Sequence, residues 1–258
     1  MSKYRFKGKT CVYCLTEPST PTGDHVFARE FFLPERRNNL PKVPACLSCN
    51  GEKSVLEHRL TALLPFGAQH MDVIPDLTNI GKRVAKNAKL RRELAASISS
   101  ERVETSPGVY ARRLAIPFLF DDLHDLFAFI VKGLIWHHWS VELPDRFGVK
   151  VGSITTSGEQ VFAELQTKNV NQSVVKNLGN GTFTYQGAQG ADYPELTVWV
   201  FSIYGGVKLS GLPESQDNES SRIGAITARQ TLLESPAFKA LFRACSHESK
   251  SLDDECER

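Results

Sequence analysis

Four cysteines near the start of the chain form two Cys-x-x-Cys pairs, Cys11/Cys14 and Cys46/Cys49. Four thiolates suit a closed, tetrahedral zinc site, which stabilises a region too small to bury a large apolar core. We therefore expect a structural zinc ion on these residues. The spacing of the cysteines also fits a plain zinc ribbon without catalysis, so the residues between the pairs must decide between these alternatives.

Asp24, His25 and Asn50 have side chains that suit hydrolysis of a phosphodiester bond. A neutral histidine is a good general base near pH 7, and carboxylate and amide oxygens are ligands for Mg²⁺. Neighbouring residues on a strand point to opposite faces. An extended Asp24-His25 would therefore place a metal ligand and a base on opposite sides of a phosphate. Taken alone, such a pair is more typical of a surface turn; its position between the cysteine pairs favours catalysis.

These motifs resemble the HNH (ββα-metal) endonuclease family in its zinc-binding branch, over roughly the first 60 of 258 residues. The resemblance implies that a catalytic Mg²⁺ or Mn²⁺ ion binds Asp24 and Asn50, and that His25 is the general base. It also implies that Asn38 or Asn39 orients the base. The matching segments are Cys11-Val12-Tyr13-Cys14, Asp24-His25-Val26, Asn38-Asn39-Leu40, Val43-Pro44-Ala45-Cys46-Leu47-Ser48-Cys49-Asn50 and Lys53.

Other polar residues are candidates for contacts with a nucleic acid or for ordinary structural roles. We expect Lys53 either to contact a phosphate or to lie on a solvated helix face, and Glu57 and His58 to pack or face solvent rather than bind metal. Tyr185, Tyr193 and Trp199 fit either base stacking or, as we favour, scaffold. Candidates for phosphate contacts are Arg29, Arg36, Arg37 and Lys42, and the basic run Lys82, Arg83, Lys86, Lys89, Arg91 and Arg92.

The pattern of apolar and turn residues predicts an α+β fold with two parts. Residues 1–62 are expected to form the ββα-metal (HNH) module, with β-like pieces at Val12-Tyr13 and Val26-Phe27 and a helix that the second cysteine pair opens. Residues 63–258 are expected to form an α+β body. Its expected parts are a helical segment (63–143, with clear helices at about 80–99 and 121–140), a β-rich segment (147–212) forming a small antiparallel sheet, with strands near 147–152, 160–165, 181–185 and 196–204, and a C-terminal helix near 225–243 with an acidic tail (213–258).

Composition fits an ordinary globular protein, with 41% hydrophobic and 23% charged residues. The net charge of +2 is far from that of a purely electrostatic DNA binder. We expect a cytoplasmic protein without a membrane span, in which paired cysteines bind metal rather than form disulfides. Cys245 and Cys256 are expected to stand apart from the metal site.

The sequence thus predicts a metal-dependent DNA endonuclease, and the family resemblance suggests a role in restriction or phage defence. Two alternatives stay open: a non-catalytic zinc module that binds nucleic acid or a protein, and a nuclease that acts on RNA. A homodimer is plausible, because cutting both strands of a duplex often uses two active sites.

Overall fold

The computed structural model of the protein combines helices with antiparallel sheets. It describes residues 6–16, 22–67, 80–81, 84–85, 87–97, 99–115, 120–168, 172–206 and 222–242. Its elements up to the central helix are β1 (Thr22–His25), η1 (Arg29–Phe31), η2 (Pro34–Arg36), β2 (Lys42–Ala45), α1 (Leu47–Leu63), η3 (Leu64–Gly67), α3 (Ala88–Ser97), β3 (Ser99–Ser106), β4 (Val109–Ala115) and α4 (Phe120–Trp139). The later elements are β5 (Phe147–Ser153), α5 (Thr156–Lys168), β6 (Ser173–Leu178), β7 (Phe183–Gln189), β8 (Thr197–Ile203), β9 (Ile223–Arg229), α6 (Gln230–Leu233) and α7 (Pro236–Lys239).

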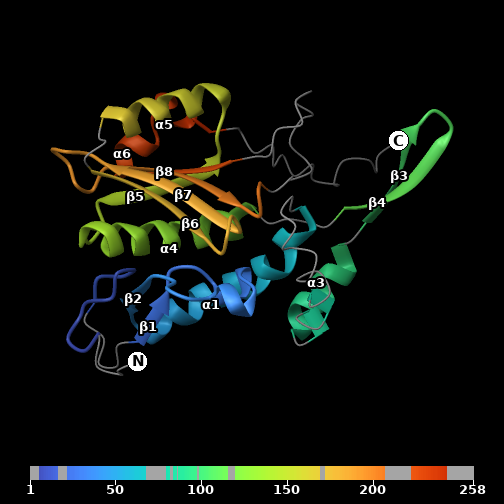
Figure 1. Ribbon diagram of the computed structural model, residues 1–258, viewed down its shortest axis with the longest axis horizontal. Helices are drawn as coiled ribbons and strands as arrows, with labels where there is room; N and C mark the ends of the chain where they lie inside the picture. The colour runs from blue at the N-terminus through green and yellow to red at the C-terminus, as the bar shows by residue number, and fades with distance from the viewer. Residues whose placement is uncertain are drawn as a thin grey trace, which may run out of the picture.

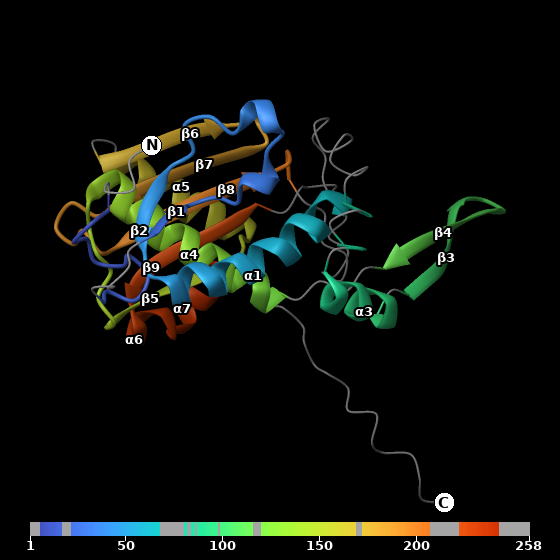
Figure 2. The same cartoon turned by 90° about the horizontal axis from the view of Figure 1, so that it is seen from below.

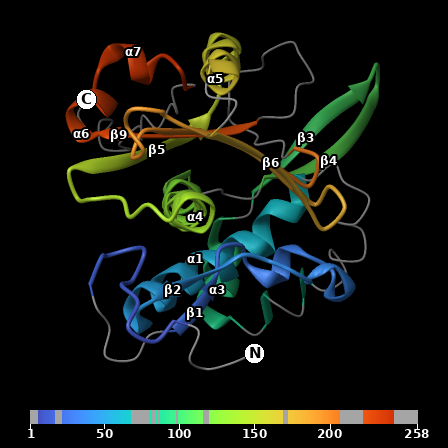
Figure 3. The same cartoon turned by 60° about the vertical axis from the view of Figure 1, so that its left-hand side comes forward.

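The elements stack in layers around helix α4 (Figure 1). On one side of α4 lies the antiparallel sheet β5-β9-β8-β7-β6, whose far face is covered by α5 together with α6 and α7. On the other side lie the hairpin β1–β2 and helix α1, as Figure 3 also shows. The hairpin β3–β4 extends away from these layers, next to α3 (Figure 2). Helix α4 therefore lies between the sheet on one side and the hairpin β1–β2 and helix α1 on the other.

The sequence of α4 explains its central position. Leu123, Phe127, Ile130 and Leu134 are fully buried, and so are residues on other faces of the helix, such as Val131. A helix that is apolar nearly all round is a buried helix rather than a surface one. The predicted helix at 121–140 is thus confirmed within one residue at each end.

The five-stranded sheet buries different side chains on its two faces, as the period of two along a strand requires. Trp199 and Phe201 of β8 belong to the apolar core shared with α4, whereas Val198 packs into a second cluster beneath α5. By the same alternation, Phe183 and Tyr185 of β7 point into the core shared with α4. The predicted antiparallel sheet is confirmed, with three of its four predicted strands in place and two strands, β6 and β9, that the sequence did not indicate.

Three predicted segments are wrong. Residues 160–165 belong to helix α5, because Phe162 and Leu165 point to one side at helical spacing, and Val161 is exposed. The C-terminal helix expected at 225–243 is instead strand β9 followed by the short helices α6 and α7. The helical segment expected before α4 contains the hairpin β3–β4, which turns at Gly108 with a φ of 78°.

The motif region, residues 11–63, begins with a turn rather than a strand. Residues 12–14 form a turn, in which the Leu15 amide donates to the Cys11 carbonyl at 2.9 Å. Strand β1 lies at Thr22–His25, before the predicted Val26-Phe27 piece, and pairs antiparallel with β2; helix α1 follows directly. The elements from β1 to α1 are thus a strand, a strand and a helix.

The motif region and the rest of the chain share one apolar core. The ring centroids of Phe27 and Phe183 lie 4.4 Å apart, and those of Tyr13 and Phe129 lie 4.9 Å apart. An added Cβ at Gly133 of α4 would lie 3.0 Å from Cγ2 of Val26, which shows how closely α4 approaches the end of β1. The predicted division into 1–62 and 63–258 stays a prediction; its boundary falls at the last residues of α1.

Candidate functional site

The four cysteines of the two pairs come together and can hold a metal ion such as zinc. Their sulfur atoms all lie within 4.8 Å of one another. The Sγ atoms of Cys14 and Cys46 are 3.8 Å apart, which is about the edge of a tetrahedron with metal–sulfur bonds of about 2.3 Å. Burial raises the pKa of the Cys11 and Cys49 thiols. Metal binding at these residues would therefore release protons.

The cysteine cluster joins the turn at residues 12–14 to the start of α1. Cys46 is the N-cap of α1, and its sulfur accepts the backbone N–H of Cys49 at 3.4 Å. The backbone N–H of Asn50 then donates to the Cys46 carbonyl at 3.0 Å, so the helix begins within the second cysteine pair as predicted. A metal ion held here would fix the first turn of α1, and with it Asn50.

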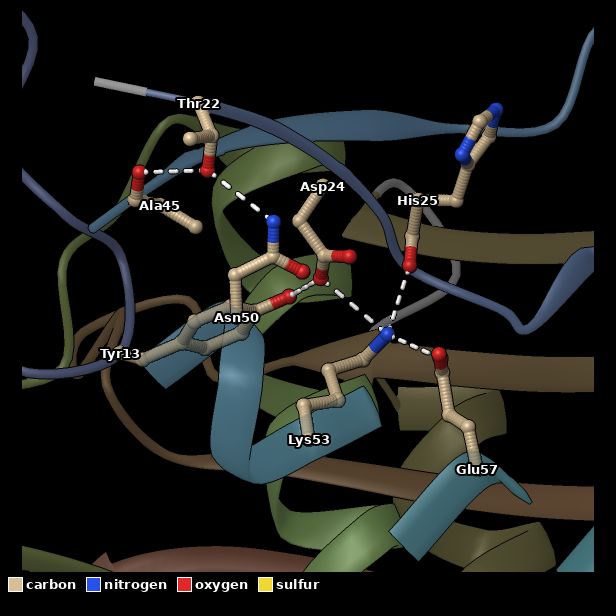
Figure 4. A network of polar contacts seen from close by, with 8 residues as sticks. All are labelled: Tyr13, Thr22, Asp24, His25, Ala45, Asn50, Lys53 and Glu57. Atoms are coloured by element: carbon tan, nitrogen blue, oxygen red, sulfur yellow. Dashed lines mark hydrogen bonds and ion pairs between the residues drawn. The ribbon is translucent and has the colours of Figure 1, made fainter. Parts of the chain in front are cut away.

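Asp24 and Asn50 approach each other on one side of β1 (Figure 4). Asp24 is 6% exposed. Its Oδ2 accepts the Tyr13 hydroxyl at 2.5 Å and lies 3.1 Å from the Lys53 ammonium, so neither contact occupies Oδ1. The Asn50 amide nitrogen donates to the Thr22 hydroxyl at 3.1 Å, which turns the amide oxygen toward Asp24. In Figure 4 the amide oxygen lies on the side of Oδ2, the oxygen that Tyr13 and Lys53 contact, whereas Oδ1 points away from Asn50. The two side chains offer oxygen atoms of the kinds that Mg²⁺ prefers.

His25 points to the opposite side of β1, away from Asp24 (Figure 4). The alternation of side chains along a strand predicts this divergence. Partial burial, and then the positive charges of Lys42 and Arg29, lower the pKa of the His25 imidazole to about 4. Lys42 is the cross-strand partner of His25. At neutral pH the imidazole is therefore uncharged and stands among cationic groups, where a phosphate would be attracted and a proton repelled.

Lys53 and Glu57 form a buried centre that the sequence did not reveal. Lys53 is fully buried, which excludes both a phosphate contact and a solvated face. Its ammonium donates to the His25 carbonyl at 2.7 Å, to Asp24 and to Glu57. Burial raises the pKa of Glu57 to about 7 despite the nearby ammonium. The i,i+4 spacing of Lys53 and Glu57 was the available signal, but it does not show which way a helix face points.

Tyr13 completes this network from the other cysteine pair. Burial, and then the negative charge of Asp24, raise the pKa of the Tyr13 phenol well above its ordinary value. The hydroxyl therefore remains protonated and donates to Asp24. The Tyr13 carbonyl accepts the Lys132 ammonium at 3.1 Å, which links the network to α4.

The predicted phosphate contacts divide into exposed and structural residues. Arg36 donates to the Gly179 carbonyl at 3.2 Å and Arg37 to the Phe32 carbonyl at 3.0 Å, so both hold loops together. Arg29 is exposed next to the site. In the basic run, Lys89, Arg91 and Arg92 are exposed on α3, whereas Lys82, Arg83 and Lys86 lie outside the described residues, as do Cys245 and Cys256.

The candidates for base stacking are mostly scaffold. Trp199 and Tyr185 are 0% and 2% exposed, so their rings cannot stack on a base, whereas Tyr193 is 65% exposed. The Tyr185 hydroxyl lies 3.0 Å from Nε2 of His138, on the side of the sheet that packs against α4. Asn38 and Asn39 lie in an exposed turn before β2, where Asn39 has a φ of 60°.

Comparisons with known proteins found no matching family model, curated protein or solved structure. Within the part of the chain that the structure describes, the longest apolar helices still fall short of the length and hydropathy that a membrane crossing requires.

Proposed function

We propose that the protein is a metal-dependent endonuclease of the HNH type that hydrolyses DNA phosphodiester bonds. In this proposal Asp24 and Asn50 hold a divalent ion, Mg²⁺ or Mn²⁺, and His25 is the general base. Cys11, Cys14, Cys46 and Cys49 hold a structural zinc ion. The restriction or phage-defence role suggested by the family resemblance remains part of the proposal.

One observation carries the proposal: two adjacent residues of β1 present different chemistry on its two sides. Asp24 faces the amide of Asn50, and His25 faces away among Arg29 and Lys42 (Figure 4). A phosphate at the end of β1 could meet oxygen ligands from one side and a neutral imidazole from the other. This is the separation that in-line attack on phosphorus needs, since the nucleophile and the leaving oxygen lie on opposite sides.

The chain's own residues would perform the reaction as follows. The neutral His25 imidazole accepts a proton from a water molecule, and the oxygen of that water forms a bond to phosphorus. The bond between phosphorus and the leaving oxygen breaks, and that oxygen later takes up a proton. Arg29 and Lys42 offset the negative charge of the phosphate. A divalent ion held by Asp24 and Asn50 would supply electrostatic stabilisation of the charge that develops on the leaving oxygen.

The zinc ion in this proposal has a structural role. Four thiolate ligands leave no open position for water or substrate, as in closed structural sites. By fixing the N-cap of α1 at Cys46, the ion would hold Asn50 in register with β1. Loss of zinc would therefore abolish the divalent-ion site indirectly, through the position of Asn50.

The proposal is tested with purified, zinc-loaded protein on plasmid DNA and on single-stranded and duplex RNA, each with Mg²⁺ or Mn²⁺. We expect cleavage of DNA that needs the added ion, and its loss in Asp24→Asn, which keeps the size of the side chain and removes the charge. Asp125→Asn is the matched control, since Asp125 is exposed on α4. Cleavage of RNA alone would move the assignment to an RNA nuclease. DNA cleavage that is equal in wild type and Asp24→Asn would overturn the catalytic assignment.

A second candidate function has one observation in its favour. The Lys53 ammonium already neutralises Asp24, and a buried ion pair of this kind can be purely structural. In that case the region would be a zinc module that binds nucleic acid or a protein without cutting. Wild-type protein that binds DNA but leaves every substrate intact with either metal ion would favour this reading.

A further inference from the structure

The buried centre around Lys53 has an excess of negative charge. The ammonium carries one positive charge, and the Asp24 and Glu57 carboxylates carry one negative charge each when ionised, which gives +1 − 2 = −1. One carboxylate would already neutralise the ammonium. Burying a second one is costly, because a charge loses its hydration in the interior. A second, part-buried carboxylate beside an ammonium that is already paired is therefore well matched by a further positive charge.

A divalent ion on Asp24 would be that further charge. The ammonium lies 3.1 Å from Oδ2 of Asp24, so an ion on the same carboxylate would be repelled by Lys53. With Glu57 ionised, the centre and the ion together carry −1 + 2 = +1; without Glu57 they would carry +2. In addition, Glu57 and the His25 carbonyl bind the ammonium on the side away from Asn50 (Figure 4).

From this we infer that Glu57 is a positioning residue for the divalent ion: it balances the charge of Lys53 and so leaves the Asp24 carboxylate able to bind a cation. Tyr13 assists from the other side, because its hydroxyl donates to Oδ2 at 2.5 Å and thereby restrains the carboxylate. Neither residue touches the reacting atoms. The inference rests on the proposed cation site. It adds Glu57 and Tyr13 to that site, beside Asp24, His25 and Asn50.

Lys53 also links the two sides of the site. Its bond to the His25 carbonyl fixes the peptide plane that follows His25 at the end of β1. A shift of the ammonium toward Asp24 would therefore weaken cation binding and disturb His25 together. The charge of Glu57 opposes that shift, which is why its removal is the most informative change.

The test measures Mn²⁺ binding to the full-length, zinc-loaded protein without DNA, by isothermal titration calorimetry and by electron paramagnetic resonance. We expect Glu57→Gln to raise the Kd for Mn²⁺ at least about tenfold, the scale of one nearby charge on an ionisation equilibrium. Zinc content should be unchanged. Glu52→Gln is the matched control, because Glu52 is exposed on the same helix and bonds Ser48 rather than Lys53. Its Kd should match the wild type.

Tyr13→Phe provides a second, nearly isosteric variant if Glu57→Gln does not fold, and it should raise the Kd for Mn²⁺ several-fold. A purely structural role for Glu57 and Tyr13 would lower the melting temperature and leave the Kd of the folded protein unchanged, which would overturn the inference alone. Mn²⁺ binding that is absent from the wild type, or equal in Asp24→Asn, would overturn the inference together with the cation site of the proposed function.

Discussion

The motif region buries different kinds of side chain from those on the face of the sheet that packs against α4. Around β1 and α1 the interior holds charged groups, including the fully buried Lys53 and the nearly buried Asp24. On the opposite side of α4, the sheet presents the stacked rings of Trp199 and Phe201, whose centres lie 6.2 Å apart. Buried charges stabilise a fold poorly compared with apolar packing. Under the proposed function, the motif region is organised for chemistry and the sheet for support.

One chain of polar groups inside the sheet shows the same contrast, because its members are neutral and bonded to one another. The Trp199 indole donates to the Thr197 hydroxyl at 2.8 Å, and the Thr197 and Thr227 hydroxyls are 2.8 Å apart. Thr227 donates in turn to the Glu195 carbonyl at 2.5 Å. Such a chain satisfies buried hydroxyls and fixes the strand register without a group that titrates near neutral pH.

The largest expected effect comes from the cysteine cluster. Cys46→Ser should lose zinc and leave the motif region without its fixed turn, since apparent binding free energies for structural zinc reach roughly 10–16 kcal/mol. Metal analysis and thermal unfolding check this, with Cys245→Ser, at a position that the sequence predicts to stand apart from the metal site, as the control. A Cys46→Ser protein that unfolds at the wild-type temperature would show that no metal stabilises this region.

The buried ion pairs should be the next most sensitive point. Lys53→Met leaves Asp24 and Glu57 without their shared cation, and we expect a loss of about 3–5 kcal/mol of unfolding free energy. The double variant with Glu57→Gln should recover part of that loss, because one uncompensated charge is removed. Chemical denaturation measures both.

Lys89→Met is the control for this pair of variants. Its side chain is 82% exposed, and it should change stability by no more than about 0.5 kcal/mol. If Lys53→Met were as mild as Lys89→Met, the charges around Lys53 would not be coupled as the structure indicates.

A substitution in the core of the sheet should lower the stability of the protein without changing Mn²⁺ binding at the site. Trp199→Ala removes a fully buried ring and is expected to cost about 3–5 kcal/mol. At temperatures where this variant is folded, its Kd for Mn²⁺ should equal that of the wild type. Tyr193→Ala, at an exposed position, is the matched aromatic control for stability. A weakened Mn²⁺ affinity in folded Trp199→Ala would contradict the division between support and chemistry.

The smallest expected effect is a shift in pH dependence. The pKa of His25 is lowered to about 4, so the imidazole is neutral and competent as a base above that value and is lost as a base below it. The kcat/KM for DNA cleavage should therefore show no decline from protonation of His25 between pH 7 and pH 5. A half-maximal rate near pH 6.5 would mean that the His25 side chain is hydrated and unperturbed in the working protein.

The cysteine cluster, α4 and the divergence of Asp24 and His25 could be predicted from the sequence because each depends on local rules. Two cysteine pairs at fixed spacing, an apolar segment and the alternation of a strand are short-range signals. Helix α5 was misread because Val161-Phe162 also fits a strand. Strand β9 was missed because both of its faces are buried by small or apolar residues, including Ala225 and Ala228, which favour a helix in isolation.

The centre around Lys53 could not be predicted, since it depends on how α1 packs against β1. A lysine three residues after Asn50 looks like a surface residue in the sequence, and its spacing to Glu57 is common on exposed helices. Only the approach of α1 to the His25 carbonyl makes that face an interior one. Long-range packing therefore determined which charges became part of the site.

The most direct measurement is the single-turnover rate of DNA cleavage by zinc-loaded wild type, His25→Ala and His124→Ala, with saturating Mg²⁺ or Mn²⁺. His124 is partly exposed on α4 and bonds Asp125, so its removal serves as the matched histidine control. General-base catalysis contributes roughly 10²–10⁴-fold. The account predicts a loss of that size in His25→Ala and a wild-type rate in His124→Ala. Equal cleavage by all three proteins, or no cleavage by any of them, would contradict it.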